Sequence, residues 1–145
     1  MMGTGDFNDD GDPDILWQND ATGARVVWFM NGTTRSSSAN LPSVSTEWQI
    51  AGAADFNNDD QDDILWQNSA TGARAIWLMN GATLSSAINL GGVQTQWNIA
   101  ASSDFTGDGR PDILFEHKLT GRRVIWVMNN TLHIGSLNLP NVATD

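Results

Sequence analysis

Three short segments of the 145-residue chain hold most of its acidic side chains. Residues 6–14, 55–63 and 104–112 contain 13 of the 17 Asp and Glu residues. Carboxylates this close together repel one another unless a cation lies between them. Oxygen-rich segments of this kind are typical of calcium loops, because calcium takes about 6–8 oxygen ligands at roughly 2.3–2.6 Å.

The oxygen donors have the same spacing in all three segments. Counted from the first Asp, side chains at positions 1, 3, 5 and 9 can converge on one ion, and position 7 is expected to contribute its backbone carbonyl. The candidate ligands are Asp6, Asn8, Asp10, Asp12 and Asp14; Asp55, Asn57, Asp59, Gln61 and Asp63; and Asp104, Thr106, Asp108, Arg110 and Asp112. Magnesium keeps more water, and transition metals prefer His or Cys, which these segments lack. The sequence therefore predicts up to three Ca²⁺ ions per chain.

The three predicted loops are not equivalent. The first has every expected donor and Gly11 at the bend, whereas the second has Asp60 there, a residue that adopts a left-handed conformation less readily. The third has Thr106 as a poorer donor and the positive charge of Arg110, so we expect it to bind calcium most weakly. None is an EF-hand, because position 12 is aromatic (Trp17 in the first loop) where that motif needs Glu.

The acidic segments belong to one repeat with a period of 49 residues. The same offset relates Ile15-Leu16-Trp17 to Ile64-Leu65-Trp66 and to Ile113-Leu114-Phe115. Short apolar runs separated by Thr-Gly and Asn-Gly turns are typical of antiparallel strands and hairpins. Each repeat is expected to form four antiparallel strands, one before the acidic loop and three after it. A unit of this kind and length is a β-propeller blade, so we predict an all-β chain.

The domain organisation follows from the repeat. We predict a single domain over residues 1–145, with three four-stranded blades at about 1–46, 47–95 and 96–145. Three blades do not close a propeller, which typically has about 4–8 blades, whereas two chains supply six. We therefore expect a homodimer that forms a six-bladed ring. The alternative is that the chain is a fragment, or a shortened or designed propeller with no ligand of its own.

The composition excludes several classes of protein. A net charge of −10 argues against binding nucleic acid, whose phosphates would be repelled. The chain has no Cys, which excludes disulfides and zinc–thiolate sites, and no apolar run long enough to span a membrane. His117 and His133 are the only histidines and have no counterparts in the other repeats, so we do not expect an enzyme.

The motif Asp-Phe-Asn-x-Asp-Gly-x-x-Asp-Ile-Leu-Trp-Gln-Asn, followed by Thr-Gly and Trp-x-Met-Asn-Gly, resembles the FG-GAP/VCBS repeats. The resemblance implies a β-propeller, often seven-bladed, like the integrin α-subunit head and certain lectins. It also implies that the calcium loop joins the inner strand of each blade to the second. An extracellular or cell-surface location rests on the resemblance alone, since residues 1–5 do not resemble a signal peptide.

Two functions remain open at this point. The first is a lectin-like module that binds carbohydrate between neighbouring blades, and the second is a protein-interaction or adhesion scaffold. Most tryptophans are expected in the core, although Trp48 and Trp97, at strand starts, could be partly exposed. The arginines that follow each Thr-Gly turn are interpreted as a solvated strand edge: Arg25, Arg74 and Arg123.

Overall fold

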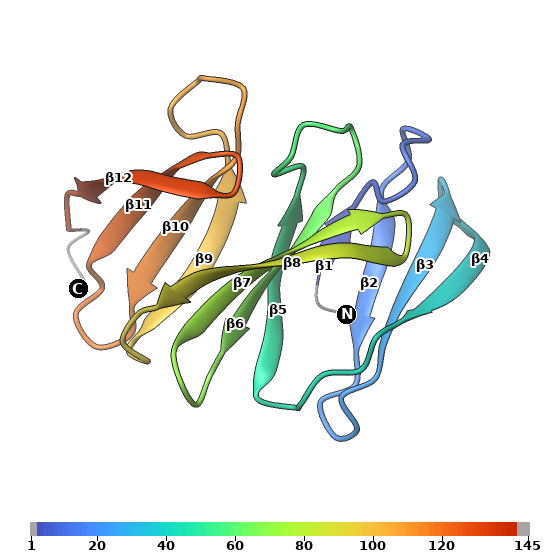
Figure 1. The fold of residues 1–145 in the computed structure, drawn as a ribbon, viewed down its shortest axis with the longest axis horizontal. Coiled ribbons are helices and arrows are strands. Elements are labelled where there is room, and N and C mark those ends of the chain that lie inside the picture. The colour runs from blue at the N-terminus through green and yellow to red at the C-terminus, as the bar shows by residue number, and fades with distance from the viewer. Residues whose placement is uncertain (1–2, 142–145) are drawn as a thin grey trace.

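The computed structural model describes residues 3–141, which form three four-stranded antiparallel sheets (Figure 1). Blade 1 contains β1 (Gly3–Gly5), β2 (Asp14–Gln18), β3 (Arg25–Asn31) and β4 (Thr34–Leu41). Blade 2 contains β5 (Trp48–Ala54), β6 (Asp63–Asn68), β7 (Ala73–Asn80) and β8 (Thr83–Gly92). Blade 3 contains β9 (Trp97–Ser103), β10 (Asp112–His117), β11 (Arg123–Asn129) and β12 (Leu132–Leu139). The predicted all-β class is confirmed.

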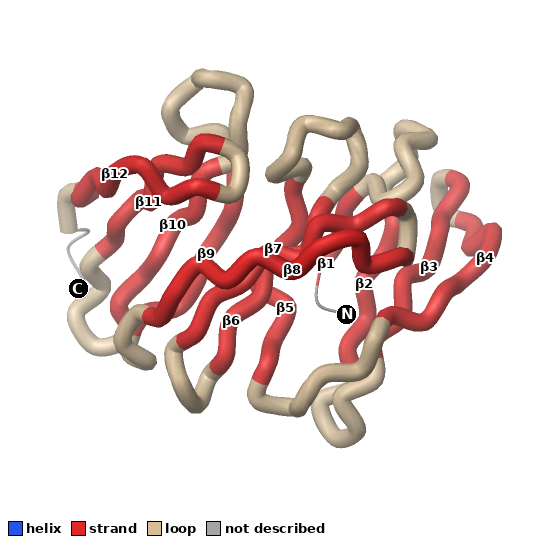
Figure 2. Tube along the Cα trace, viewed as in Figure 1, coloured by secondary structure: helices blue, strands red, loops and turns tan. Residues whose placement is uncertain are grey.

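The strand order within each sheet follows the chain, as expected for blades joined by hairpins. The first strand of each blade precedes the acidic loop, and the other three follow it. Figure 2 shows the three acidic loops at one end of the molecule, with the turns between the second and third strands at the opposite end. The Asn-Gly hairpins have the left-handed glycines that such turns require, Gly32 and Gly81, each with φ of 58°. Asn130 takes the same conformation in blade 3, with φ of 54°.

Side chains alternate between the two faces of each blade, and the blades pack face to face. We call the face that contacts the following blade the downstream face and the opposite one the upstream face. Phe7, Leu16 and Val27 on the downstream face of blade 1 form one core cluster with Ile64 and Trp66 on the upstream face of blade 2. Burying each of these side chains contributes about 1.5–3 kcal/mol. The fold is therefore held together mainly between blades.

The second interface repeats the first. Phe56, Leu65 and Ile76 on blade 2 form a second cluster with Ile113 and Phe115 on blade 3. The inner strands, β1, β5 and β9, lie next to one another along the row of blades. This arrangement packs Trp66 of blade 2 and Phe115 of blade 3 against the preceding blade.

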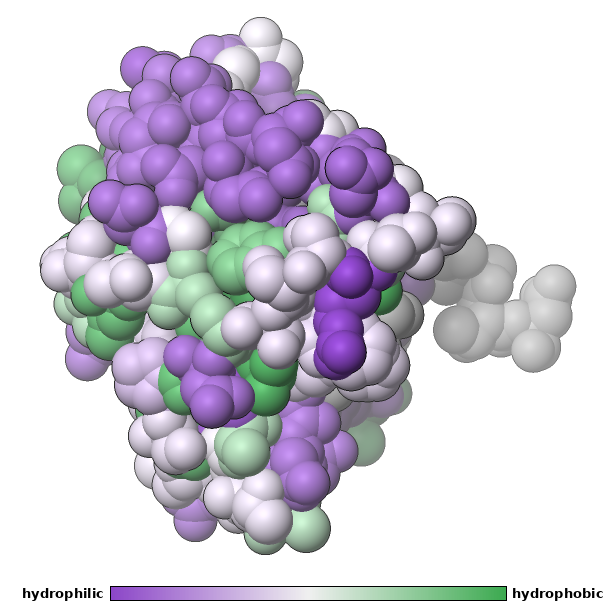
Figure 3. All heavy atoms as spheres, turned by 90° about the vertical axis from the view of Figure 1, so that its right-hand side faces the viewer, coloured by the Kyte–Doolittle hydropathy of each residue, from purple (hydrophilic) through white to green (hydrophobic). Residues whose placement is uncertain are grey.

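Two faces have no neighbour within residues 3–141. The upstream face of blade 1 leaves Ile15 and Trp17 half-buried, although their counterparts Ile64 and Trp66 are 0% and 1% exposed. On the downstream face of blade 3, Phe105 is 42% exposed. Figure 3, which views the molecule from the side of blade 1, shows a hydrophobic patch at mid-height below a hydrophilic end. No helix among the described residues is long and apolar enough to cross a membrane.

Acidic loops and inter-blade clefts as the candidate functional site

The first Asp of each acidic loop organises the loop backbone. In the first loop the Asp6 carboxylate accepts hydrogen bonds from the N–H groups of Asp10, at 3.2 Å, and Gly11, at 2.9 Å. Asp55 and Asp104 accept equivalent bonds in the other loops. The backbone N–H bonds, that of Gly109 foremost, lower the pKa of Asp104. Position 1 therefore behaves as the cap of a tight turn.

The bend predicted at position 6 is present in every loop. Gly11, Asp60 and Gly109 all have left-handed backbones, with φ of 85°, 68° and 83°. Position 4 is also left-handed, in Asp9, Asn58 and Gly107. The sequence interpretation missed this second bend, although Asp, Asn and Gly are the residues that tolerate it best.

The last Asp of each loop is a buried structural residue. Asp14, Asp63 and Asp112 are 0% exposed. Asp63 accepts hydrogen bonds from the N–H of Phe56 and of Met79, both at 2.9 Å, and so ties the loop to β7. Burial raises its pKa to about 6, against the opposing effect of these two bonds, and burial likewise raises the pKa of Asp14.

The middle donors form a chain of local contacts. Asn8 Nδ2 donates to Asp10 Oδ2 at 2.9 Å, and Asn57 makes the same bond to Asp59. The side chain at position 7 also forms a hydrogen bond, since the Asp12 carboxylate accepts from Gly32 N at 3.1 Å. In the same way Gln61 accepts from Gly81 N at 2.8 Å. These bonds tie two of the loops to the Asn-Gly hairpins.

The third loop departs from this pattern. Arg110 lies 3.7 Å from Asp108 in an exposed ion pair, and the N–H of Thr106 donates to Asp112 at 3.2 Å. Within residues 3–141, no three or more His, Cys, Asp or Glu side chains are placed to hold one metal ion. The candidate ligands of each site therefore lie in one loop, but most of their carboxylates accept hydrogen bonds from backbone N–H groups.

The first two acidic loops are linked to each other across the blades. Asp62 N donates to the carbonyl of Asp6 at 2.8 Å, and Asp6 N donates to Asp62 Oδ2 at 2.9 Å. Burial raises the pKa of Asp62. Pro111, which occupies this position in the third loop, has no N–H to donate. The link therefore belongs to the first interface only.

The arginines after the Thr-Gly turns are not at a solvated edge, and that interpretation was wrong for two of them. Arg25 and Arg74 are 1% and 2% exposed. Arg25 donates to the carbonyls of Gly23, Val44 and Trp48, and its guanidinium lies 5.1 Å from the centre of a Trp66 ring. Each guanidinium therefore bridges its own blade and the next.

Arg74 repeats this arrangement one blade later. It donates to the carbonyls of Gly72 and Trp97 and lies 5.7 Å from the Phe115 ring centre. The sequence signal for this role was the recurrence of Arg two residues after a Gly in every repeat. Gly72 is required because a Cβ there would collide with the Val93 carbonyl of the crossing linker.

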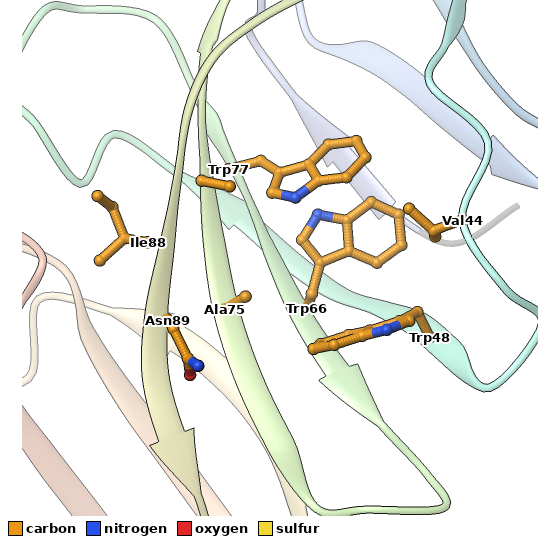
Figure 4. Close-up of a pocket in the computed structure, with 8 residues that line it drawn as sticks. Val44, Trp48, Trp66, Ala75, Trp77, Ile88 and Asn89 are labelled. Atoms are coloured by element: carbon orange, nitrogen blue, oxygen red, sulfur yellow. The ribbon is translucent and has the colours of Figure 1, made fainter.

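Aromatic side chains line a cleft beside each interface. The first cleft has a volume of about 300 Å³ and lies against Trp48, Trp66 and Trp77. Figure 4 shows Trp66 between the other two rings, with Val44 at the side. The Trp66 and Trp77 ring centres are 4.8 Å apart and tilted by 54°.

The second cleft is the repeat equivalent of the first. It has a volume of about 360 Å³ and is lined by Val93, Trp97, Phe115 and Trp126, among others. Trp48 and Trp97 are half-buried, as expected for residues at strand starts. The structure thus places two matched apolar clefts beside the interfaces, each lined by one blade and by the segment that connects it to the preceding blade.

The two histidines replace residues of the repeat. His117 occupies the place of Asn19 and Asn68, and its Nδ1 accepts N–H bonds from Leu119 and Thr120 at 3.3 Å. His133 stacks on Trp126 with ring centres 4.2 Å apart. Arg35 covers Trp28 in the same way in blade 1.

Four-stranded antiparallel sheets packed face to face, each with an acidic loop after its inner strand, define a β-propeller module. The model of the FG-GAP-like repeat family matches residues 6–66 and again residues 55–115. The chain belongs to the FG-GAP-like repeat family, as the resemblance of its motifs implied. No curated protein and no solved structure matches the chain.

Proposed function

We propose that this β-propeller module binds carbohydrate in the clefts between its blades and that calcium stabilises its acidic loops. The observation that carries the proposal is the repetition of the aromatic cleft, at Trp48, Trp66 and Trp77 and again at Trp97, Phe115 and Trp126. Aromatic rings stack on the apolar faces of sugars. Repeated sites of moderate affinity also gain avidity on a multivalent surface.

The carbohydrate proposal is tested on a glycan array, with competition by free sugar. Trp48→Ala and Trp97→Ala should each weaken binding about tenfold in one cleft, the effect of losing roughly 1.4 kcal/mol. Leu119→Ala is the control, because Leu119 is 81% exposed and is not among the residues that line either cleft. Absence of sugar binding, with specific capture of a protein partner, would instead support the adhesion scaffold.

The calcium proposal is supported by the loops' chemistry. The first two loops offer carboxylate, amide and carbonyl oxygens, and the third offers a hydroxyl in place of the amide. None of the loops contains His or Cys, so the donor set suits a hard cation. The donors at positions 1 and 5 lie at the surface or half-buried. To bind calcium, these carboxylates must release the hydrogen bonds that they accept from loop N–H groups and coordinate the ion instead.

Calcium removal tests this proposal directly. Saturating Ca²⁺ at about 100 times the dissociation constant stabilises by roughly 2.7 kcal/mol per site, so chelation should lower the Tm by several degrees. Asp10→Ala should abolish calorimetric binding at the first loop, and Asp20→Ala, outside the loops, should not. An unchanged Tm after chelation contradicts the proposal.

We also propose that two chains form a six-bladed ring. The half-buried upstream face of blade 1 and the exposed Phe105 of blade 3 are the counterparts of surfaces that pack inside the chain. Head-to-tail contacts of this kind close into rings when the rotation allows. Sedimentation at several concentrations tests it, and a stable monomer in calcium contradicts it.

A further inference from the structure

A polar pocket of about 240 Å³ lies between blades 2 and 3. The pocket is lined in part by residues at the start of β5 and β9 and at the end of β6, and Figure 1 shows these strand ends opposite the acidic loops. Its lining includes two cationic side chains, Arg74 and Lys118, together with Gln67, Ser69 and Asn98. No Asp or Glu is among the described residues that line it. In a chain of net charge −10, this is an unusual local excess of positive charge.

The corresponding place in the first interface is filled by a carboxylate. Asp20 is the repeat counterpart of Ser69, and Gln18 is the counterpart of Gln67. Gln18 Nε2 donates to Asp20 Oδ1 at 2.9 Å. Burial lowers the pKa of the neighbouring Arg25, and the Asp20 charge opposes that lowering. The first interface thus supplies its own anion.

The second interface keeps the donors Gln67 and Arg74 but has Ser69 in place of the Asp20 carboxylate. Gln67 has the orientation of Gln18, because its Oε1 accepts from Ile99 N at 3.0 Å as Gln18 Oε1 accepts from Ile50 N at 3.1 Å. Among the described residues, its Nε2 has no counterpart of the bond from Gln18 to Asp20. Burial alone lowers the pKa of Arg74, with no acidic side chain opposing it.

Lys118 strengthens the same contrast. Its counterpart in the first interface is Ser69, so the second interface gains one cation where it has lost one anion. The backbone N–H of Lys118 donates to the carbonyl of Gln96 at 2.8 Å, which fixes the residue beside the pocket. Asn98, which also lines the pocket, adds an amide.

We propose that this pocket binds the carboxylate of a small ligand, in the place that the Asp20 carboxylate takes between blades 1 and 2. Gln67 Nε2 donates to the carboxylate, Lys118 forms an ion pair with it, and the charge of Arg74 stabilises it. Only the identity of the carrier rests on the proposed function, under which the carboxylate belongs to an acidic sugar. The acidic loops lie at the other end, where salt screens their charge beyond about 8 Å.

The test is an NMR titration of the full chain with acetate, glucuronate and glucose, in calcium-containing buffer at constant ionic strength. Acetate reports the carboxylate alone, and the comparison of glucuronate with glucose reports what the carboxylate adds to a sugar. We expect acetate and glucuronate to shift the side-chain amide signals of Gln67 and Asn98, and glucose to leave them unchanged. Glucuronate binding tighter than acetate identifies an acidic sugar as the carrier.

Two variants replace a residue of the second interface by its counterpart from the first. Ser69→Asp places a carboxylate where Asp20 lies and should weaken acetate binding at least about tenfold, since the internal carboxylate competes. Lys118→Ser should weaken it roughly two- to fivefold, the range of an exposed ion pair. Arg35→Ser is the control, because it removes an equal charge from an exposed position on β4 of blade 1 and should change nothing.

Three results overturn the proposal: no carboxylate-dependent shift at Gln67, unchanged binding in Ser69→Asp, or equal weakening by Arg35→Ser and Lys118→Ser. The last result would show only general attraction of anions. These outcomes are separable from failure of the carbohydrate proposal. Acetate binding without any glycan binding would support the carboxylate site and contradict the lectin-like function.

Discussion

The faces between blades and the open downstream face of blade 3 are built from the same repeat but differ in what covers them. Phe7 and Phe56 are 0% exposed between blades, whereas Phe105 is 42% exposed. Arg25 and Arg74 bridge to the next blade, whereas Arg123 forms an ion pair with Glu116 of its own blade, at 2.8 Å. A residue's role in this repeat therefore depends on its neighbour more than on its own strand.

The comparison is tested most strongly by the phenylalanines. Phe56→Ala should destabilise the chain by about 3–5 kcal/mol, because it opens a cavity in the second core cluster. Phe105→Ala should change the free energy of unfolding by less than about 1 kcal/mol in a monomer, since its side chain is already exposed. Denaturant unfolding at low protein concentration measures both.

The same two variants also test whether the downstream face of blade 3 stays uncovered in solution. If a second chain covers blade 3, Phe105→Ala becomes more costly as the protein concentration rises, because association stabilises the folded chain. Equal losses for both variants at every concentration would show that the open face is packed by other means.

The arginines give the next largest difference. Arg74→Met should destabilise by about 2–4 kcal/mol, because it removes the hydrogen bonds that the buried guanidinium donates to the carbonyls of Gly72 and Trp97. Arg123→Met removes a partly exposed ion pair and should change stability by about 0.2–1 kcal/mol. Similar losses in the two variants, measured by thermal and denaturant unfolding, would contradict the bridging role.

The buried carboxylate beneath the second loop predicts a pH effect in calcium-free buffer. The pKa of Asp63 is raised to about 6 in the folded chain, so the folded state holds its proton more tightly than the unfolded state. The resulting stability is fully present below about pH 4 and is lost as the pH rises through 6, an effect on the order of 2 kcal/mol. Denaturant unfolding between these pH values measures it. Asp63→Asn should remove this part of the pH dependence, and an identical pH profile in the variant would contradict the assignment.

The smallest expected effect concerns the link between the first two acidic loops, which distinguishes the first interface from the second. Asp62→Ala removes the carboxylate that accepts from Asp6 N and should destabilise by about 1 kcal/mol. Asp20→Ala is the control and should stay within about 0.5 kcal/mol, because the exposed Asp20 accepts, among the residues described, only from the Gln18 side chain. A loss for Asp62→Ala no larger than the control's, by denaturant unfolding, would show that the link between the loops adds nothing.

The sequence by itself determined the blades. A period of 49 residues, alternating apolar strands and Asn-Gly and Thr-Gly turns specify four antiparallel strands per repeat, because these signals act over short distances along the chain. The same local chemistry located the acidic loops and their left-handed sixth residue.

Tertiary structure alone decided what the repeated polar residues do. The sequence places Arg25 and Arg74 at the surface, whereas in the structure the following blade provides carbonyls and an aromatic ring that hold their guanidinium groups. The roles of Asp63 and Asp62 likewise depend on amides from β7 and from the neighbouring loop. Contacts between blades join residues a whole repeat apart, and no local pattern states which groups will meet there.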